Sequence, residues 1–257
     1  MGTYNTEDTP SNGDTHFGYE SVSSDEKAGK VAEVFHSVAR RYDLMNDLMT
    51  WGLHRRWKRA AIRLSGVRRG DAALDLAAGT GDIALRLARI VGPEGAVVLS
   101  DINPSMLAEA ERRLAGNPLA ARISLKEADA EALPFADAAF DVVTIGFGLR
   151  NVTDKDRAVR EMLRVLGPGG RMVVLEFSRP VAWLVRPFYH VYSFAVLPAL
   201  GFVCTRDAAS YRYLAESIRV HPDRDTLQAM IVAQGFARCE CRTMLFGIVA
   251  AHIGVKA

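Results

Sequence analysis

The chain has 257 residues, of which 49% are hydrophobic and 24% charged, and its formal net charge at pH 7 is +2. That length and composition predict one substantial core, with a single domain as the default organisation. So small a net charge, without a basic stripe interleaved with aromatic residues, argues against a nucleic-acid-binding protein, and no nucleic acid partner is expected.

Polar residues dominate the start of the chain. Residues 1–24 lack an apolar segment, so we expect a disordered tail and no signal peptide, followed by a single domain over residues 25–257 of a cytoplasmic protein. The basic run over residues 55–59 is typical of a solvated helix face, and contact with a membrane surface is the alternative. N-terminal helices are expected over residues 25–66, because apolar residues recur at helical spacing at Val31, Val34, Phe35, Val38, Tyr42, Met45 and Met49. Together with a helical insertion over residues 181–220, they are expected to form a substrate lid over the carboxyl ends of the strands.

An apolar run over residues 72–76 leads into a turn of small residues, Ala77-Ala78-Gly79-Thr80-Gly81-Asp82, which opens onto an amphipathic segment. This order predicts a strand, a tight glycine turn and a helix, the first unit of a nucleotide-binding α/β domain. Glycine suits the turn because the backbone must bend sharply and let a ligand approach closely. The glycine pattern alone also fits a dinucleotide-binding site.

The carboxylates around this turn favour a different ligand. Asp75 and Asp82 bracket it, and a pyrophosphate prefers a positive helix terminus with no anion nearby. S-adenosylmethionine carries a sulfonium and an ammonium and no phosphate, so it suits such a site. Asp101 ends the next predicted strand, residues 96–101, where a carboxylate can accept both ribose hydroxyls. The alternative is that Asp82 only caps the helix and that Asp75 is an ordinary residue at a strand end.

Three further strands are predicted over residues 123–125, 141–145 and 171–177. Strands that alternate with helices and read as nearly continuous apolar runs indicate a parallel sheet covered on both faces. Asp129 and Ala130 follow the first of these strands, and we expect them to bind the adenine ring through a carboxylate and a neighbouring backbone N–H. A solvated loop carboxylate is the alternative for Asp129.

A hydrophobic stretch over residues 181–203 is interrupted by Arg186, Pro187, His190 and Pro198, too often to span a bilayer comfortably. It belongs to a predicted helical insertion over residues 181–220. That insertion either packs over the fifth strand or covers a hydrophobic substrate as a lid that touches the membrane interface. Its aromatic residues are Trp183, Phe188, Tyr189, Tyr192, Phe194 and Phe202.

Four motifs resemble those of the ubiquinone/menaquinone biosynthesis C-methyltransferases, and the similarity runs from about residue 16 to the C-terminus. Two departures are Ala78, where many relatives have glycine, and Gly146, where some have serine. The motifs are residues 41–49 with Trp51-Gly52 and His54-Arg55, residues 147–152, residues 164–171 with Leu175-Glu176-Phe177-Ser178, and residues 210–218.

The resemblance implies a class I S-adenosylmethionine-dependent methyltransferase with a Rossmann-like α/β fold. Its sheet would be mostly parallel and seven-stranded, with helices on both faces. The implied reaction methylates a ring carbon of a polyprenylated quinol, a benzoquinol or demethylmenaquinol, and the family's cofactor positions fall on Thr80, Asp101, Asp129 and Ala130.

Methyl transfer to an aromatic carbon requires a ring hydroxyl that is deprotonated or strongly hydrogen-bonded, and a site that excludes water. Arg150 and Asn151 follow the fourth strand beside the cofactor site. We expect Arg150 to stabilise the developing phenolate and Asn151 to orient the hydroxyl or a relaying water. A salt bridge from Arg150 to Asp154 or Asp156 is the alternative. Secondary catalytic candidates are Asp43, Tyr42 and Tyr211.

No metal is expected, because the three cysteines, Cys204, Cys239 and Cys241, have no further ligands at metal spacing. The expected partners are the quinol, a peripheral membrane contact and a quinone-biosynthesis complex. Three other functions fit the residues less completely. They are methylation of another small aromatic molecule, nicotinamide-dependent reduction, and a non-catalytic cofactor-binding role in such a complex.

Overall fold

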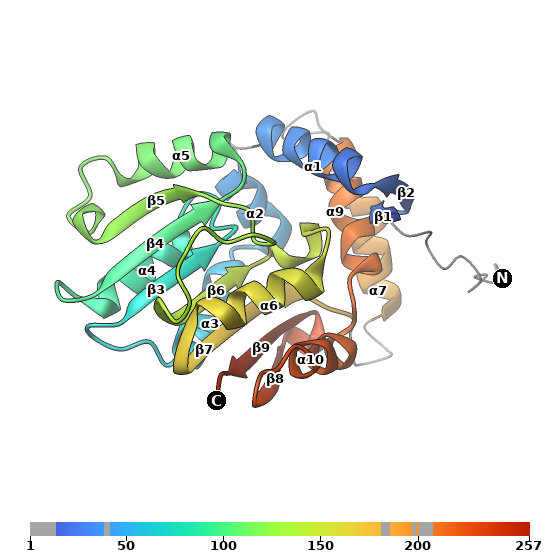
Figure 1. Ribbon diagram of the computed structural model, residues 1–257. Helices are drawn as coiled ribbons and strands as arrows, with labels where there is room; N and C mark the ends of the chain where they lie inside the picture. The colour runs from blue at the N-terminus through green and yellow to red at the C-terminus, as the bar shows by residue number, and fades with distance from the viewer. Residues whose placement is uncertain (1–13, 39–41, 181–185, 197–198, 200–207) are drawn as a thin grey trace.

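A computed structural model describes residues 14–38, 42–180, 186–196, 199 and 208–257, without some of their side chains. At its centre is a seven-stranded sheet with strand order β5-β4-β3-β6-β7-β9-β8 (Figure 1). Only β9 runs antiparallel to its neighbours, which confirms the predicted α/β fold with a mostly parallel sheet. The strands are β3 Ala72–Leu76, β4 Ala96–Asp101, β5 Ile123–Glu127, β6 Phe140–Gly146, β7 Leu166–Phe177, β8 Arg238–Met244 and β9 Val249–Val255.

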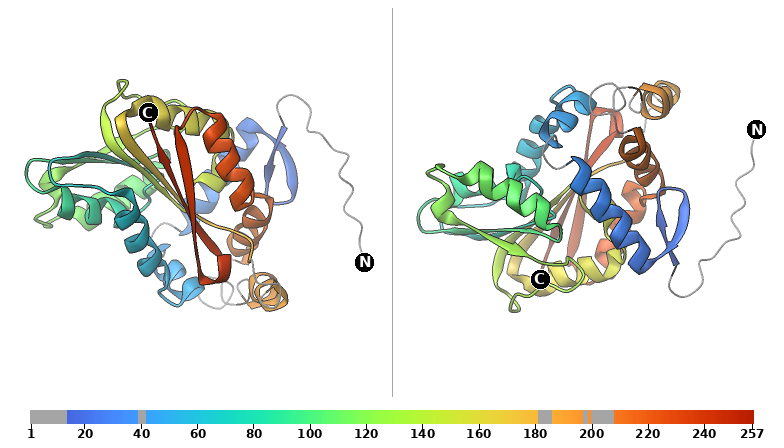
Figure 2. Two further views of the ribbon diagram at one scale, coloured as in Figure 1. Left: turned by 90° about the horizontal axis from the view of Figure 1, so that it is seen from below. Right: turned by 90° about the horizontal axis from the view of Figure 1, so that it is seen from above.

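Helices cover both faces of this sheet (Figure 2). Leu74 and Leu76 of β3 pack with α6 and α10, whereas Ala73 between them packs with α3, α4 and α5. Alternate side chains of a strand point to opposite faces, so a strand covered on both sides is apolar throughout. The helices are α3 His54–Ser65, α4 Asp82–Val91, α5 Pro104–Leu114, α6 Lys155–Val165 and α10 Arg224–Ala233.

Apart from the 3-10 turn η2 Ala120–Arg122, which directly precedes β5, the remaining elements gather at the carboxyl edge of the sheet (Figure 1). The predicted helical region before the sheet, residues 25–66, contains α1 Ser24–Val38, α2 Tyr42–Thr50 and α3. The insertion contains α7 Arg186–Val191, the π-helix η5 Tyr192–Val196 and α9 Ala208–Val220, and its Trp183 and Phe202 lie outside the described residues. Further short 3-10 turns are η3 Leu149–Asn151 and η6 Leu245–Gly247. Where the chain is described, none of its helices has the length and apolar character needed to cross a membrane.

The N-terminal segment is partly ordered, contrary to the prediction of a tail through residue 24. Strands β1 Asp14–Phe17 and β2 Glu20–Ser23 form an antiparallel hairpin. Phe17 stacks on Tyr213 of α9 with ring centroids 4.1 Å apart, and the Tyr19 N–H donates to Glu216. A two-stranded hairpin is marginal alone, so it depends on this packing. The predicted tail is therefore wrong for residues 14–24, while residues 1–13 lie outside the described part.

The contact between Phe17 and Tyr213 predicts a measurable coupling. We expect a double-mutant cycle with Phe17→Leu and Tyr213→Leu to give about 0.5–1.5 kcal/mol of interaction free energy in urea unfolding. As a control, Phe17→Leu combined with Leu114→Ala, in the core cluster of α5, should be additive within about 0.5 kcal/mol. Additive effects of the Phe17 and Tyr213 changes would contradict the stacking contact.

Candidate active site

A cavity of about 920 Å³ lies where β3, β4, β5 and β6 end. Open α/β sheets bind their ligands at this edge. Helix α1 closes the cavity opposite the strands, with the His36 Nδ1 atom 2.8 Å from the Ser105 hydroxyl and the Asn103 amide donating to the Ala32 carbonyl. Its lining includes Ala28, Val31 and Phe35 of α1, and Leu76, Gly79, Asp101, Ile102, Asn103, Met106, Ala128, Asp129, Ala130, Glu131, Phe147, Gly148 and Asn151.

Asp101 joins the end of β4 to the glycine turn. One of its carboxylate oxygens accepts the Gly79 N–H at 2.9 Å and the other accepts the Asn103 N–H at 2.9 Å. Burial raises the pKa of this carboxyl, and the backbone N–H groups oppose that rise. The carboxylate is therefore held in one orientation, with part of its surface on the cavity.

The turn itself has the conformation that its glycines allow. Gly81 has φ of +81° just before α4, and a Cβ there would lie 2.6 Å from the Leu99 side chain. The Ala78 N–H donates to the Ser100 carbonyl at 3.0 Å, so alanine is compatible with this position of the turn. Thr80 and Gly81 do not belong to the cavity lining, and the Thr80 hydroxyl instead accepts a hydrogen bond from Arg113.

The two carboxylates that bracket the turn do not line the cavity. Asp75 is fully buried and accepts a 2.7 Å hydrogen bond from the Thr144 hydroxyl, and burial raises its pKa to about 7. Burial would raise the pKa of Asp82 too, but Lys58 and Arg86 outweigh it and hold that pKa below its ordinary value. We expected both side chains to face the bound cation, whereas the structure pairs them with protein groups.

Other carboxylates supply the negative charge that the cavity has. Its lining contains six of them, against one guanidinium, Arg157, and one imidazole, His36. A concave site with an excess of one charge concentrates ligands of the opposite charge. The six are Asp25, Glu33, Asp101, Asp129, Glu131 and Asp154, of which only Asp101 and Asp129 were predicted to bind the cofactor.

The structure brings the predicted adenine contacts into the same cavity as Asp101. Asp129 and Ala130 both belong to the lining, directly after β5. The Asp129 carboxylate accepts the Glu131 N–H at 2.9 Å, which fixes the local turn. Because β4 and β5 are parallel neighbours, their carboxyl ends place Asp101 and Asp129 on one edge.

Arg150 is buried behind the cavity and is not part of its lining. Its guanidinium forms an ion pair with Glu176 at 3.1 Å and donates to the Phe147 carbonyl. The alternative partners that the sequence suggested, Asp154 and Asp156, are thus not the ion-pair partners of Arg150. Glu176 was missed as a partner, although it lies in one of the four motifs.

Asn151, the next residue, does line the cavity. Its side-chain oxygen accepts a 3.0 Å hydrogen bond from the Tyr213 hydroxyl. Burial raises the pKa of Tyr213 to about 12, so this hydroxyl keeps its proton and donates. Tyr213 therefore holds a residue of the cavity lining without lining the cavity itself, and it was not among the predicted residues although it lies in the motif over residues 210–218.

Of the other catalytic candidates, only Tyr211 has a described side chain, and it lies apart from this group. Tyr211 is 1% exposed and packs with Met49, Leu214 and Ile218, outside the cavity lining. Asp43 and Tyr42 belong to α2, but their side chains lie outside the described part of the chain. The described part of the 181–220 insertion contributes no lining residue, so α1, rather than that part of the insertion, covers the cavity.

The buried Asp75 carboxyl predicts a pH dependence. In the unfolded chain it loses its proton at about pH 4, whereas in the folded chain it keeps that proton up to about pH 7. Between these values the folded state binds the extra proton, so Asp75 lowers the free energy of unfolding as the pH rises. Asp75→Asn lacks this loss, and we expect its stability relative to wild type to rise by a few kcal/mol between about pH 4 and about pH 8 in urea unfolding. If the free energies of unfolding of Asp75→Asn and wild type changed with pH in parallel, this prediction would be contradicted.

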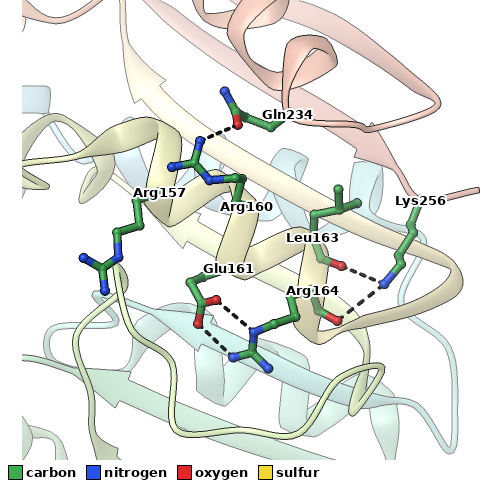
Figure 3. Close-up of a pocket in the computed structure, with 7 residues that line it drawn as sticks. All are labelled: Arg157, Arg160, Glu161, Leu163, Arg164, Gln234 and Lys256. Carbon is green, nitrogen blue, oxygen red and sulfur yellow. Dashed lines mark hydrogen bonds and ion pairs between the residues drawn. The ribbon is translucent and has the colours of Figure 1, made fainter.

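A second cavity of about 610 Å³ lies against the outer face of α6 (Figure 3). Arg164 pairs there with Glu161, and Arg160 donates to Gln234. The Lys256 ammonium donates to carbonyls at the end of α6, including that of Leu163 at 2.8 Å. These charged groups of the second cavity are paired with neighbouring side chains or hold the C-terminus to the helix. The candidate ligand site is therefore the first cavity, at the carboxyl edge of the sheet, which we call the acidic cavity.

Comparisons with known proteins show the family and the fold of this chain. The model of the ubiE/COQ5 methyltransferase family matches residues 22–256. Proteins from Pseudomonas paraeruginosa and Pseudomonas putida, each named ubiquinone/menaquinone biosynthesis C-methyltransferase UbiE, are 58% identical over 242 residues, 94% of this chain and of theirs. A solved putative S-adenosylmethionine-dependent methyltransferase from Methanococcus maripaludis shares the fold, with a TM-score of 0.63 at 16% identity over 86% of this chain and 93% of that one. The chain belongs to the ubiE/COQ5 methyltransferase family.

Proposed function

We propose that this methyltransferase transfers a methyl group from S-adenosylmethionine to a ring carbon of a polyprenylated quinol in ubiquinone or menaquinone biosynthesis. The observation that carries the proposal is the 58% identity, over 94% of the chain, to relatives named for that reaction. The acidic cavity at the carboxyl edge of the sheet supports it, because its charge suits a sulfonium and an ammonium.

In this proposal the cofactor occupies the part of the cavity between β3, β4 and β5. Asp101 accepts hydrogen bonds from the ribose hydroxyls, while Asp129 and the Ala130 N–H bind the adenine. Gly79, Thr80 and Gly81 shape the turn that the cofactor approaches, and Asp75 supports β3 behind it. The bound cofactor supplies an electrophilic methyl group, and the chain's own residues prepare the ring carbon that accepts it.

Asn151 is the residue best placed to prepare the ring. It faces the cavity, and the Tyr213 hydroxyl holds its side-chain oxygen, which leaves the amide N–H groups to donate to a ring oxygen or a water. Arg150 precedes it in η3, where its ion pair with Glu176 fixes the turn. We therefore assign Arg150 as a positioning residue, with Asp43 of α2 and Tyr211 of α9 retained as further candidates.

Membrane contact and complex membership extend the same proposal. A polyprenyl tail partitions into lipid, so an enzyme that acts on its ring gains from a peripheral membrane contact. A quinone-biosynthesis complex would serve the same need by passing the tail between proteins.

The deciding experiment incubates the purified protein with methyl-labelled S-adenosylmethionine and each reduced demethylquinone in detergent. We expect label in the quinol and a product mass increased by one methyl group. Cofactor binding without turnover would instead indicate a non-catalytic subunit, and turnover only on soluble phenols a different acceptor. Thermal protection by NAD but not by S-adenosylhomocysteine would indicate a reductase.

A further inference from the structure

Large apolar side chains are exposed at one rim of the molecule. Trp51, in the turn between α2 and α3, is 82% exposed, and Phe246, in the turn between β8 and β9, is 67% exposed. Monomeric proteins rarely expose several large apolar groups together without a binding role. We call this set the apolar rim, and its members are Leu44, Trp51, Val191, Val196, Leu245 and Phe246.

The apolar rim is formed by three segments that lie side by side: α2 with the turn after it, α7 with η5, and the turn between β8 and β9. The Tyr192 hydroxyl of η5 donates to the Met49 carbonyl of α2 at 2.9 Å. Leu53, just after Trp51, packs on the same core cluster as Met244 and Ile248, which flank the β8–β9 turn. Both views in Figure 2 place α7, the start of α3 and this turn together.

This rim borders the edge of the sheet where the cavity lies. Phe177 at the end of β7 pairs with Val249 at the start of β9, so the β8–β9 turn stands at the carboxyl edge. Phe147, which lines the cavity, lies 4.7 Å from the Phe177 ring, and Phe177 lies 6.2 Å from the ring of Trp57 in α3. These three rings pack in one core cluster that extends from the cavity to the first turns of α3, beside Trp51, and we call this row of rings the aromatic wall.

Backbone conformation keeps these side chains at the tips of their turns. Trp51, Leu245 and Phe246 have φ values of +51°, +49° and +55°. Bulky residues rarely adopt this left-handed conformation, and such strain tends to persist where it serves a function. Smaller or polar residues would fit these turns with less strain.

Basic residues flank the apolar rim on α3. Arg55, Arg56 and Arg59 are exposed in the first turns of this helix, and His54–Ser65 contains no carboxylate. Arg55 pairs with Asp47, and the Arg59 Nε atom donates to the Arg55 carbonyl at 3.3 Å. Arg56 and the terminal guanidinium nitrogens of Arg59 face solvent on the exposed side of the helix, where they can interact with another surface. Guanidinium groups beside exposed aromatic residues match the headgroup region of an anionic bilayer, while two copies of this surface would repel each other.

We propose that the apolar rim docks on an anionic lipid bilayer, with Trp51, Leu245 and Phe246 at headgroup depth and Arg56 and Arg59 against lipid phosphates. Docking would let a polyprenylated quinol pass from the bilayer towards the cavity along the aromatic wall, and only this purpose rests on the proposed function. Docking itself requires neither cofactor nor turnover.

Cosedimentation with vesicles tests the docking directly. We expect wild type to bind phosphatidylcholine vesicles that contain phosphatidylglycerol, and to bind pure phosphatidylcholine and high-salt samples more weakly. The double variant Trp51→Ser/Phe246→Ser should lose roughly a hundredfold in partition coefficient, and Arg56→Glu roughly tenfold. Matched controls are Ile90→Ser and Arg89→Glu at the far end of α4, which should bind as wild type does.

Other outcomes would overturn the docking surface. Equal vesicle binding by the double variant and Ile90→Ser would do so, as would a wild-type protein that binds no anionic vesicle. A change from dimer to monomer in light scattering, with unchanged vesicle binding, would assign the rim to self-association. Activity on a short-tailed, water-soluble quinol separates the two proposals, because the docking variant should keep that activity and lose activity on long-tailed quinol in vesicles.

Discussion

Replacing Asp101 with asparagine is expected to weaken S-adenosylmethionine binding roughly a hundredfold, because hydrogen bonds to a charged acceptor each contribute about 1.5–3 kcal/mol. Both carboxylate oxygens already accept backbone N–H groups, from Gly79 and Asn103. An amide has only one accepting oxygen, so Asp101→Asn leaves one of these donors facing an NH₂ group. The variant loses charge toward the ribose and also loosens the glycine turn.

Isothermal titration with S-adenosylmethionine and S-adenosylhomocysteine measures this effect. The matched control is Asp141→Asn, because Asp141 accepts the Ala72 N–H at 2.9 Å at the start of β3, away from the cavity. We expect that variant to bind both ligands as wild type does. Equal affinities for Asp101→Asn and wild type would remove Asp101 from the cofactor site.

Asn151→Ala is expected to lower the single-turnover rate about 100-fold to 1,000-fold, the range found when one donor to a developing oxyanion is removed. Cofactor affinity should stay nearly unchanged, since the proposed adenosine contacts come from Asp101, Asp129 and Ala130. The substitution removes the donor that faces the cavity and also the acceptor of the Tyr213 hydroxyl. Rapid quench with labelled cofactor and reduced quinol gives the rate.

Two further variants separate catalysis from structure. Tyr213→Phe keeps the Asn151 amide but removes the hydroxyl that donates to its oxygen, so we expect a smaller fall in rate than with Asn151→Ala. Asn117→Ala, which removes an amide that accepts the Leu119 N–H far from the cavity, should leave the rate unchanged. A wild-type rate for Asn151→Ala would end its catalytic assignment.

Local patterns in the sequence were enough for the five parallel strands from β3 to β7 and for two carboxylates of the candidate cavity, whereas a seven-stranded sheet was expected only from the family resemblance. Periodicity and glycine spacing placed β3, β4 and the turn between Leu76 and α4. Since parallel strands bring their carboxyl ends to one edge, Asp101 and Asp129 could be expected to meet there. Four motifs then indicated the family, because each combines residues whose chance co-occurrence is small.

Only the tertiary structure decided which polar groups face the cavity and which face one another. Arg150 and Glu176 are 26 positions apart, Asn151 and Tyr213 are 62 apart, and Asp75 and Thr144 are 69 apart. A window of local sequence contains one member of each pair, so it cannot show that a buried charge already has its partner. The hairpin over residues 14–23 was missed for the same reason, since Phe17 is stabilised by a ring of α9 at the other end of the chain.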